Sequence, residues 1–311
     1  MAKILVVCGP TATGKTSLAI HLAQKFGGEL VSADSKQVYK GLDIGTGKGV
    51  PPQSRKKGFY EYKRIRIWGY DLVGPKEAFS VSQFVSFARA KIAKIHKEGK
   101  LPIVVGGTGL YIRAIVDGIS TVEIPRKEAL RGKLAEKTKD ELFEMLAQLD
   151  PIKAGSLNAS DRKNPRRLIR AIEIATWKLE FGRGEAKAKT YGDVLFIGLT
   201  GPKEILFRKI EERIDVRLRL GLEKEIASLL KDGVDWNDQA MSSLGYRQFR
   251  GYFTGNQTKK EAIEDWKSQE RKYAKRQITW FKKDSRINWF DISTPLWQEK
   301  VEKLVKRWYS S

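Results

Sequence analysis

Short apolar runs and helix-like apolar periodicities alternate over the first 118 residues of the chain. Apolar runs of about four to eight residues are typical of buried strands, and apolar positions three or four apart are typical of helices. The pattern predicts strands at 3–8, 29–33 and 101–105 and helices at 15–26, 80–98 and 108–117. A glycine-rich loop at 34–49 and an edge strand within 59–68 complete this part. Strands that alternate with helices indicate an α/β fold with a doubly wound parallel sheet.

The pattern changes between residues 120 and 190, where no strand is expected. Two or three helices are predicted within 126–149 and 165–181, followed by a flexible basic linker at 182–189. The later elements are a strand at 193–200, helices at 202–231, 258–283 and 295–309, and a short strand at 287–290. We expect an α/β core formed by 1–119 and 191–311, with a helical C-terminal part, and a helical insertion at 120–190.

The chain is strongly basic, with 59 Lys and Arg against 37 Asp and Glu and a net charge of +22. The excess gathers in 153–190, with ten basic and four acidic residues, and in 242–290, with twelve and five. In the second segment Trp266, Tyr273 and Trp280 recur at seven-residue spacing, so we expect them to share one buried helix face. The Lys and Arg residues on the other faces of this helix are then available to bind phosphates. This layout is typical of a protein that binds nucleic acid.

Length and composition exclude several classes of protein. A chain of 311 residues, 41% of them hydrophobic, can bury a core of ordinary size. No apolar run approaches the roughly 20 residues of a membrane helix. The first strand follows Met1 and Ala2 at once, so no cleavable signal is expected. The single cysteine, Cys8, allows neither a disulfide framework nor a cysteine-based zinc site. We therefore expect a cytoplasmic protein with no membrane partner.

A complete phosphate-binding loop, Gly9-Pro10-Thr11-Ala12-Thr13-Gly14-Lys15-Thr16, joins the first strand to the first helix. In such a loop the backbone amides surround an anion, the lysine reaches the outer phosphates and the hydroxyl of Thr16 coordinates Mg²⁺. The sequence therefore predicts magnesium and a ligand with a diphosphate. The expected diphosphate contacts are Gly9, Thr11, Ala12, Thr13, Gly14, Lys15, Thr16 and Ser17.

The carboxylate that usually holds the metal in nucleotide hydrolases does not follow the strand at 101–105. A different carboxylate, Asp34, closes the strand at 29–33. Because the carboxyl ends of parallel strands share one edge of the sheet, Asp34 should lie beside the phosphate loop. It is then a candidate general base, with a helix cap as the alternative. A carboxylate that need not serve the metal favours group transfer over hydrolysis.

Two more segments are candidates for the same pocket. Thr108, within Gly106-Gly107-Thr108-Gly109, is either the cap of the next helix or a hydroxyl directed at a leaving group. Lys48 is either a surface lysine or a cation over the pocket, carried by a glycine-rich loop.

These segments together resemble the tRNA dimethylallyltransferases, also called tRNA isopentenyltransferases. The resemblance covers nearly the whole chain in the family's order: GPTATGKTSLA, DSKQVYKGLDIGTGK, VGGTGLYIRAIVDG, NPRRLIRAIEI, SLGYRQF and KRQITWFKKD. It implies transfer of a dimethylallyl group from dimethylallyl diphosphate to the N6 amine of the tRNA adenosine immediately 3′ of the anticodon, with Mg²⁺ assisting. The implied fold is P-loop NTPase-like, and the implied partner is the tRNA anticodon stem-loop, bound by a monomer.

The resemblance also implies roles for individual residues. Asp34 becomes the general base, Thr108 contacts the bridging oxygen of the leaving group, and Arg217 contacts the phosphates. Because the target base must reach a deep pocket, its extrusion from the stack is implied. The implied tRNA contacts are Asp34, Ser35, Lys36, Gln37, Arg166, Arg167, Arg170, Ser243, Gly245, Tyr246, Arg247, Lys275 and Arg276.

The chain departs from the family pattern in two places. About four residues, one helical turn, are missing between Arg217 and Gly221, and the family's usual histidine is not evident near 67–71. No zinc-finger extension follows, as in the bacterial type. Two other functions fit the phosphate loop and the charge: a P-loop kinase acting on a small metabolite or nucleoside, and an RNA-binding adaptor that only senses a nucleotide.

Overall fold

The computed structural model describes residues 3–122, 124–182 and 190–311, which form two compact units. The residues up to Asp117 and from Thr190 onward make the first unit, and the residues between them make the second. The linker predicted at 182–189 lies, apart from Gly182, outside the described residues. None of the helices within the described ranges is both long and apolar enough to cross a bilayer.

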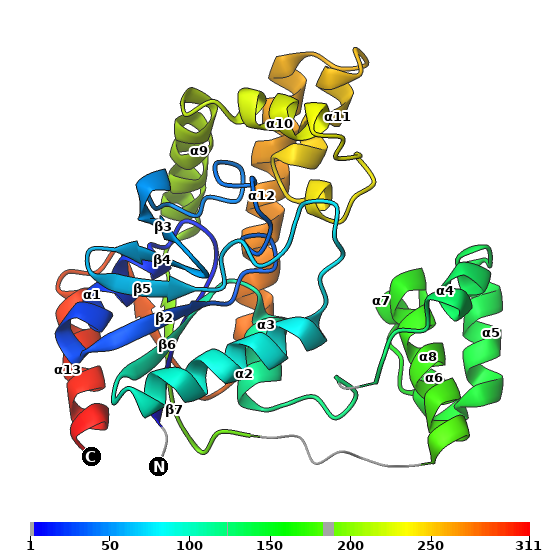
Figure 1. Ribbon diagram of the computed structural model, residues 1–311, viewed down its shortest axis with the longest axis horizontal. Coiled ribbons are helices and arrows are strands. Elements are labelled where there is room, and N and C mark those ends of the chain that lie inside the picture. The colour runs from blue at the N-terminus through cyan, green and yellow to red at the C-terminus, as the bar shows by residue number, and fades with distance from the viewer. Residues whose placement is uncertain (1–2, 123, 183–189) are drawn as a thin grey trace. The chain divides into compact units, whose positions relative to one another are not determined.

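The first unit is built on one sheet, whose described strands run in the order β3-β4-β5-β2-β6-β1-β7-β8 (Figure 1). From β5 to β8 all neighbouring strands are parallel, while β3, β4 and β5 pair antiparallel. The predicted doubly wound parallel sheet is therefore confirmed. The strand bounds are β1 Lys3–Cys8, β2 Gly28–Ser32, β3 Arg55–Lys56, β4 Phe59–Tyr62, β5 Ile65–Trp68, β6 Leu101–Gly106, β7 Asp193–Thr200 and β8 Ile287–Asp291.

Successive residues of the central strands point to opposite faces of the sheet, as strand geometry requires. Leu5 and Val7 of β1 pack with α1 (Lys15–Phe26) and α13 (Trp297–Ser310). Ile4 and Val6 belong to the core of the other face, where α2 (Val81–Lys97) and α3 (Gly109–Val116) lie. Both faces of the parallel strands are thus covered, which explains why these strands are continuous apolar runs.

The C-terminal part is helical, as predicted, but its elements differ from the predicted ones. The helix expected over 202–231 is two helices, α9 (Lys203–Arg219) and α10 (Leu222–Lys231). They separate at Gly221, whose φ of 96° lies in the left-handed region that glycine adopts readily. A further helix, α11 (Tyr246–Phe253), was not predicted, and it packs against α12 (Lys259–Phe281).

The edge strand expected within 59–68 is in fact a hairpin. Strands β4 and β5 pair antiparallel and are joined by Lys63 and Arg64, which have φ of 51° and 63°. Glycine or asparagine usually occupies such left-handed turn positions. The sequence therefore contained no turn signal, and the prediction of a single strand was wrong.

The aromatic face predicted for α12 is only partly buried. Trp266 is fully buried, but Tyr273 is partly exposed and Trp280 is 40% exposed. A seven-residue repeat drifts by only about 20° per heptad on a straight helix, so the three rings lie on one side of α12, and they differ in how much of that side is covered at each position. The buried face carries Ala262, Trp266, Glu270, Ala274, Gln277 and Phe281.

The second unit is helical in its described part, with a core of its own. Leu142, Leu146 and Leu168 are fully buried in it. Its buried carboxylate, Glu173, accepts two hydrogen bonds from the Arg131 guanidinium, at 2.6 and 2.7 Å. The helices are α4 Glu128–Ala135, α5 Lys139–Leu149, α6 Pro151–Gly155, α7 Ala159–Arg162 and α8 Pro165–Phe181.

Candidate active site

Three turns that follow parallel strands meet at one edge of the sheet in the first unit. They are the phosphate loop after β1, the turn at Asp34 after β2 and the Gly106–Thr108 turn after β6. The last two approach closely: the Ala33 amide donates to the Val105 carbonyl at 2.8 Å, and a Cβ on Gly106 would lie 2.2 Å from the Ala33 carbonyl oxygen. Glycine at 106 is therefore needed for this contact.

The phosphate loop has the backbone of an anion-binding turn. Gly9, Ala12 and Gly14 have positive φ, and a Cβ on Gly9 would lie 2.3 Å from the Leu199 carbonyl oxygen. The loop is held from α12: the side-chain oxygen of Gln277 accepts from the Thr11 amide at 2.8 Å, while its nitrogen donates to the Gly107 carbonyl at 2.9 Å. One buried side chain thus joins the turn after β1 to the turn after β6.

Lys15 lies partly buried at the start of α1, and its ammonium donates to the Pro10 carbonyl at 2.6 Å. Burial, together with repulsion from Arg213, lowers the pKa of Lys15 to about 8. The neighbouring Cys8 is buried in β1, and burial raises the pKa of its thiol to about 12. Lys15 therefore offers a poorly solvated charge to an anion, whereas the thiol of Cys8 is unreactive.

Two arginines of α9, four residues apart, face this loop. Arg213 donates to the Thr11 hydroxyl at 3.0 Å and to the Gly47 carbonyl at 3.4 Å. Arg217 is buried and pairs with Glu270 at 3.3 Å. Repulsion from Arg217, helped by burial, lowers the pKa of Arg213 to about 10, so Arg213 remains charged at neutral pH. Sequence reasoning singled out Arg217 alone; the spacing of the two residues was the signal that could have identified Arg213.

Asp34 and Thr108 lie on either side of Ser35. The Asp34 carboxylate accepts from the Lys36 amide at 2.9 Å, and the Thr108 hydroxyl accepts from the Ser35 amide at 3.1 Å. Thr108 occupies the N-cap position of α3, as the helix-cap alternative has it, but its side chain makes no capping hydrogen bond to the helix. Burial, with Asp34 nearby, raises the pKa of Tyr273, which keeps that phenol protonated beside Thr108.

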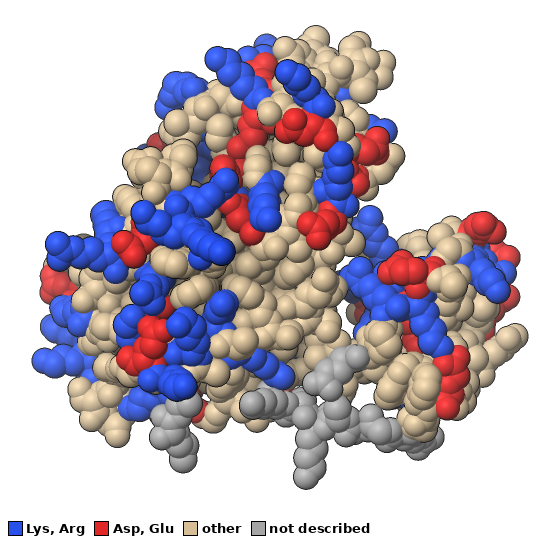
Figure 2. Space-filling view, in the orientation of Figure 1, with Lys and Arg blue, Asp and Glu red and all other residues tan. Residues whose placement is uncertain are grey.

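Most of these groups line a single cleft of about 810 Å³ within the first unit. Nine of its lining residues are Lys or Arg and three are Asp or Glu, so the cleft favours an anionic ligand. Lys and Arg side chains also gather on the face of the first unit that Figure 2 shows. Of the predicted site residues, the cleft brings together Thr11, Ala12, Gly14, Lys15, Thr16, Ser17, Asp34, Ser35, Lys36, Gln37, Arg217, Ser243, Arg247 and Arg276.

Three predicted site residues stand just outside the lining. Thr108 follows Gly107, which lines the cleft, and reaches it through its hydrogen bond to the Ser35 amide. Thr13 is buried beneath the phosphate loop, where its hydroxyl donates to the Pro10 carbonyl at 2.9 Å. Gly9, packed against Leu199, shapes the loop from behind.

Some predicted tRNA contacts do not line this cleft. Tyr246 is fully buried, and its hydroxyl donates to Glu225 at 2.5 Å. Gly245 lies under Trp266, where a Cβ would be 2.9 Å from the ring. Lys275 is exposed, with its ammonium 5.8 Å from the centre of the Phe207 ring. Gly245 and Tyr246 are thus packed positions rather than exposed ones.

Three other predicted tRNA contacts belong to the second unit. Arg166 and Arg167 are exposed in the first turn of α8, and Arg167 pairs with Asp161. Arg170 turns toward its own unit, where its guanidinium donates to the carbonyls of Thr121 and Ile124 at 2.8 and 3.0 Å. Arg170 therefore holds the segment before α4, whereas Arg166 and Arg167 remain exposed at the surface of this unit.

The described residues offer little for a tightly held metal. No group of three or more His, Cys, Asp or Glu side chains with metal-binding geometry occurs among them. Thr16 and Asp34 both line the cleft, next to the phosphate loop. Mg²⁺ usually keeps several waters and is bound through one or two protein groups plus substrate phosphates. The residues present fit an ion of that kind, carried mainly by a diphosphate.

Comparison with known proteins gives a consistent result. Residues 37–284 match a family described as IPP transferase, and residues 2–67 match one described as isopentenyl transferase. The chain is 39% identical to the tRNA dimethylallyltransferase of Anoxybacillus flavithermus, covering 97% of this chain and 95% of that one. It is 41% identical to the enzyme of the same name from Geobacillus thermodenitrificans, covering 98% and 95%. The crystal structure of the tRNA isopentenylpyrophosphate transferase of Bacillus halodurans superposes with a TM-score of 0.72 at 30% identity, covering 99% and 97%.

Proposed function

The chain belongs to the tRNA dimethylallyltransferase family, and on that premise we propose the reaction that its cleft performs. The protein transfers a dimethylallyl group from dimethylallyl diphosphate to the N6 amine of the tRNA adenosine immediately 3′ of the anticodon, releasing pyrophosphate. The observation that carries the proposal is the meeting of Asp34, Thr108, the phosphate loop and Arg213 in one basic region of the first unit.

The reaction forms an N–C bond at the adenine amine and breaks the C–O bond of the allylic diphosphate. The amine lone pair is delocalised into the ring, so the nitrogen is a poor nucleophile. Asp34 accepts the proton of the amine as the new bond forms, and the electron pair of the broken bond leaves with the diphosphate. General-base assistance of this kind contributes about 10²–10⁴ in rate.

The leaving diphosphate gains negative charge, which the cleft stabilises. Lys15 and the amides of the phosphate loop face its phosphates, with Arg213 beside Thr11 and Arg217 behind it. We assign the main arginine contact to Arg213, because the Arg217 guanidinium is already paired with Glu270. The hydroxyl of Thr108 donates a hydrogen bond to the bridging oxygen. Thr16 would hold Mg²⁺, which supplies further charge neutralisation on the phosphates when bound.

The tRNA enters from the side of Asp34, with its target base extruded from the stack. Lys36, Arg247 and Arg276 line the cleft there and would meet backbone phosphates, as would Arg166 and Arg167 of the second unit. Tyr246 supports this surface from within, through Glu225. We expect the protein to act as a monomer in the cytoplasm.

One incubation tests the proposal. Unmodified tRNA, dimethylallyl diphosphate and Mg²⁺ are combined with the protein, and the digested nucleosides are examined by mass spectrometry. We expect the mass gain of one isoprenyl group on an adenosine next to the anticodon. A parallel reaction with labelled ATP and no prenyl donor measures phosphate transfer. Phosphorylation of an acceptor, with no prenylated adenosine, would instead establish the kinase alternative.

The Asp34→Asn variant tests the role of the carboxylate. We expect prenylation to fall by about 10²–10⁴, the usual contribution of a general base, while the tRNA dissociation constant changes less than about twofold. An adaptor that only binds RNA would lose nothing by this substitution. Retention of full transferase activity would therefore remove Asp34 from the mechanism.

A further inference from the structure

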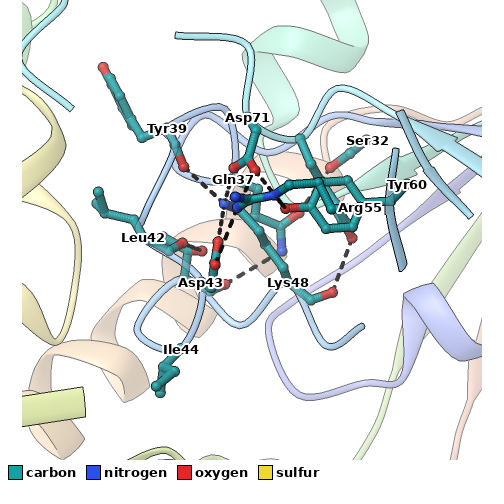
Figure 3. Close-up of polar contacts among 12 residues, drawn as sticks. Ser32, Gln37, Tyr39, Leu42, Asp43, Ile44, Lys48, Arg55, Tyr60 and Asp71 are labelled. Atoms are coloured by element: carbon teal, nitrogen blue, oxygen red, sulfur yellow. Dashed lines mark hydrogen bonds and ion pairs between the residues drawn. The ribbon is translucent and has the colours of Figure 1, made fainter. Parts of the chain in front are cut away.

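A buried lysine lies at the side of the cleft, in a group we call the Lys48 cluster: Lys48, Asp43, Asp71, Arg55 and Tyr60 (Figure 3). Lys48 is 2% exposed. Its ammonium donates to the Tyr39 carbonyl at 2.9 Å, to Asp43 at 2.5 Å and to Asp71. An ammonium has three protons, and all three are used within the protein. Lys48 is therefore neither a surface lysine nor a cation available to a phosphate.

Asp71 connects Lys48 to the β3–β4 hairpin. Its second carboxylate oxygen accepts from the Tyr60 hydroxyl at 2.5 Å and pairs with Arg55 at 2.6 Å. Arg55 also donates to the Tyr60 oxygen at 2.8 Å and lies 3.5 Å from Asp43. Burial and the adjacent Asp71 raise the pKa of Tyr60, so its phenol stays a proton donor. The cluster thus balances two carboxylates with two cations.

The loop segment 43–48 is fixed at both of its sides. On one side, Glu225 of α10 accepts the amides of Asp43, Ile44 and Gly45 at 2.9, 2.8 and 3.1 Å. On the other side stands Lys48, whose own amide donates to the Asp43 carbonyl at 3.2 Å. Between them, the Gly47 carbonyl accepts from Arg213 at 3.4 Å and from the Gln37 side chain at 3.2 Å.

Gly47 lies directly against the guanidinium groups of the two arginines of α9. Its φ is 62°, and a Cβ there would lie 2.4 Å from a nitrogen of Arg213 and 2.2 Å from one of Arg217. A shift of segment 43–48 therefore changes the position of Arg213, which the same carbonyl helps to hold against Thr11 of the phosphate loop. The contacts run without a break from Lys48 through Gly47 and Arg213 to the phosphate loop.

We propose that Lys48 is a positioning residue for the diphosphate: it seats segment 43–48 so that Gly47 directs Arg213 at the phosphates. The inference rests on the proposed function, since it concerns the same diphosphate. The charge of Lys48 is required as well as the length of its side chain. Without that charge, the two carboxylates of Asp43 and Asp71 are balanced by Arg55 alone. Their repulsion would then open the segment beside the phosphate loop.

Binding of inorganic pyrophosphate with Mg²⁺, measured by calorimetry at neutral pH, tests this without depending on prenyl transfer. We expect Lys48→Met to weaken pyrophosphate binding at least tenfold. Lys48→Arg keeps the positive charge but not the compact shape of the ammonium, so it should bind pyrophosphate more tightly than Lys48→Met and less tightly than the unchanged protein. Lys48→Met/Asp71→Asn should restore most of the affinity, because it removes the unbalanced carboxylate together with the ammonium. Lys40→Met, at an exposed lysine of the same loop, is the matched control and should change nothing.

Steady-state kinetics separate positioning from general stability. Lys48→Met should raise the KM for dimethylallyl diphosphate at least tenfold while changing kcat less than about threefold. A lower melting temperature with unchanged pyrophosphate binding and KM would overturn the proposal, and so would equally weak binding by Lys48→Met and the double variant. If wild-type protein binds pyrophosphate but prenylates no tRNA, the proposed function fails while the Lys48 test still stands.

A milder variant covers the case in which Lys48→Met does not fold. Asp43 is 43% exposed, so Asp43→Asn removes one of the two negative charges that pair with Lys48 at a tolerant position, while its side-chain oxygen can still accept a hydrogen bond. We expect it to weaken pyrophosphate binding about threefold to fivefold. Binding by Asp43→Asn that is indistinguishable from that of the unchanged protein would count against the positioning role.

Discussion

Lys15 and Arg213 carry positive charges that no carboxylate of the described residues neutralises by direct contact. Lys15 donates only to a backbone carbonyl, and Arg213 only to a hydroxyl and a carbonyl. Charges held in this way are fixed before a ligand arrives, so an anion that binds there need not reorganise them. The pKa values of both residues are lowered in the free protein. An anion bound between them would stabilise their charged forms and raise both pKa values.

The affinity for dimethylallyl diphosphate should therefore depend on pH through Lys15. In the free protein the pKa of Lys15 is about 8, and a bound diphosphate raises it. Below pH 8 the lysine is charged in both states and the dissociation constant stays level. Above pH 8 the free lysine loses its proton, and the dissociation constant should rise by about tenfold per pH unit until the pKa of the bound state. Calorimetry between pH 6.5 and 9.5 measures this, and Lys15→Met should remove the slope.

The two arginines of α9 should respond differently to the same substitution. Arg213→Gln removes a guanidinium beside the phosphates, so pyrophosphate binding should weaken by about 1.5–3 kcal/mol, the range for hydrogen bonds to charged groups. Arg217→Gln leaves Glu270 buried without its cation, which should cost about 3–5 kcal/mol of folding free energy. Pyrophosphate calorimetry and chemical denaturation distinguish the two. The reverse pattern would show that Arg217, and not Arg213, contacts the phosphates.

At the scale of elements, α12 joins several parts of the site. Its buried face includes two polar residues, Glu270 and Gln277, which reach Arg217 and the two glycine-containing turns. Hydrophobic periodicity cannot identify such a face, because its polar members are buried only through partners far away in the sequence. The spacing of the three aromatic residues likewise indicated one side of α12 but not how much of that side is covered.

Gln277→Leu should damage the site through the helix. It keeps the volume but leaves the Thr11 amide and the Gly107 carbonyl without their partner, at about 1–3 kcal/mol for each unsatisfied group. For a protein of this size the melting temperature should fall by about 2–4 °C per kcal/mol. Pyrophosphate binding should weaken as well, because the Thr11 amide is no longer held in its orientation. Thr279→Ala, on the exposed side of α12, is the control and should behave like the unchanged protein.

Most elements could be predicted from sequence because their signals are local. The bounds of β1, α1 and β7 are those the pattern predicted. The β4–β5 turn at Lys63 and Arg64 could not be found, since neither residue favours the left-handed backbone that the turn adopts. The break at Gly221 and the short helix α11 also have weak local signals, and the contacts that fix them are tertiary.

The residues of the candidate site also differ in whether a local sequence signal identifies them. Contiguous motifs contained the phosphate loop, Asp34 and Thr108, since each lies in a turn directly after a strand. Arg213 and Glu225 were missed as site residues, and Gln277 was placed in a segment implied to contact tRNA, not among the residues that hold the phosphate loop. The loop groups that they hold lie 166 to 266 positions away in sequence, so no local pattern reveals these contacts.

For the whole molecule, the second unit is inserted at a point where the first unit closes on itself. The Tyr191 amide donates to the Val116 carbonyl at 3.1 Å, so the two connections leave the first unit side by side. The described residues that line the cleft all belong to the first unit. The insertion can therefore contact a macromolecule without contributing side chains to the cleft.

Replacing residues 118–189 by a short glycine–serine linker should leave the first unit folded, because Val116 and Tyr191 are already in contact. We expect pyrophosphate affinity within about threefold of that of the full chain, and a much lower affinity for tRNA. Circular dichroism shows whether the variant is folded. Calorimetry measures its affinity for pyrophosphate, and filter binding measures its affinity for tRNA. Loss of pyrophosphate binding in a folded variant would show that the insertion contributes to the diphosphate site.

Within the full chain, Arg166→Ala/Arg167→Ala should weaken tRNA binding and flatten its dependence on salt. For every phosphate that a removed arginine had neutralised, the slope of log affinity against log salt should decrease by about 0.7–0.9. Pyrophosphate binding should not change, since both residues lie outside the first unit. An unchanged affinity and slope for tRNA would exclude this end of α8 from the RNA-binding surface.

The central strand carries a ready-made reporter of its own opening. Cys8 is the only thiol in the sequence, it is fully buried, and it lies one residue before the phosphate loop. Alkylating reagents should reach it only when the sheet opens. The rate of modification therefore measures how often the sheet opens, without any introduced label. A ligand present at 100 times its dissociation constant should slow the modification about 100-fold. The rate at which this single thiol is alkylated then reports the fraction of molecules whose phosphate loop is occupied.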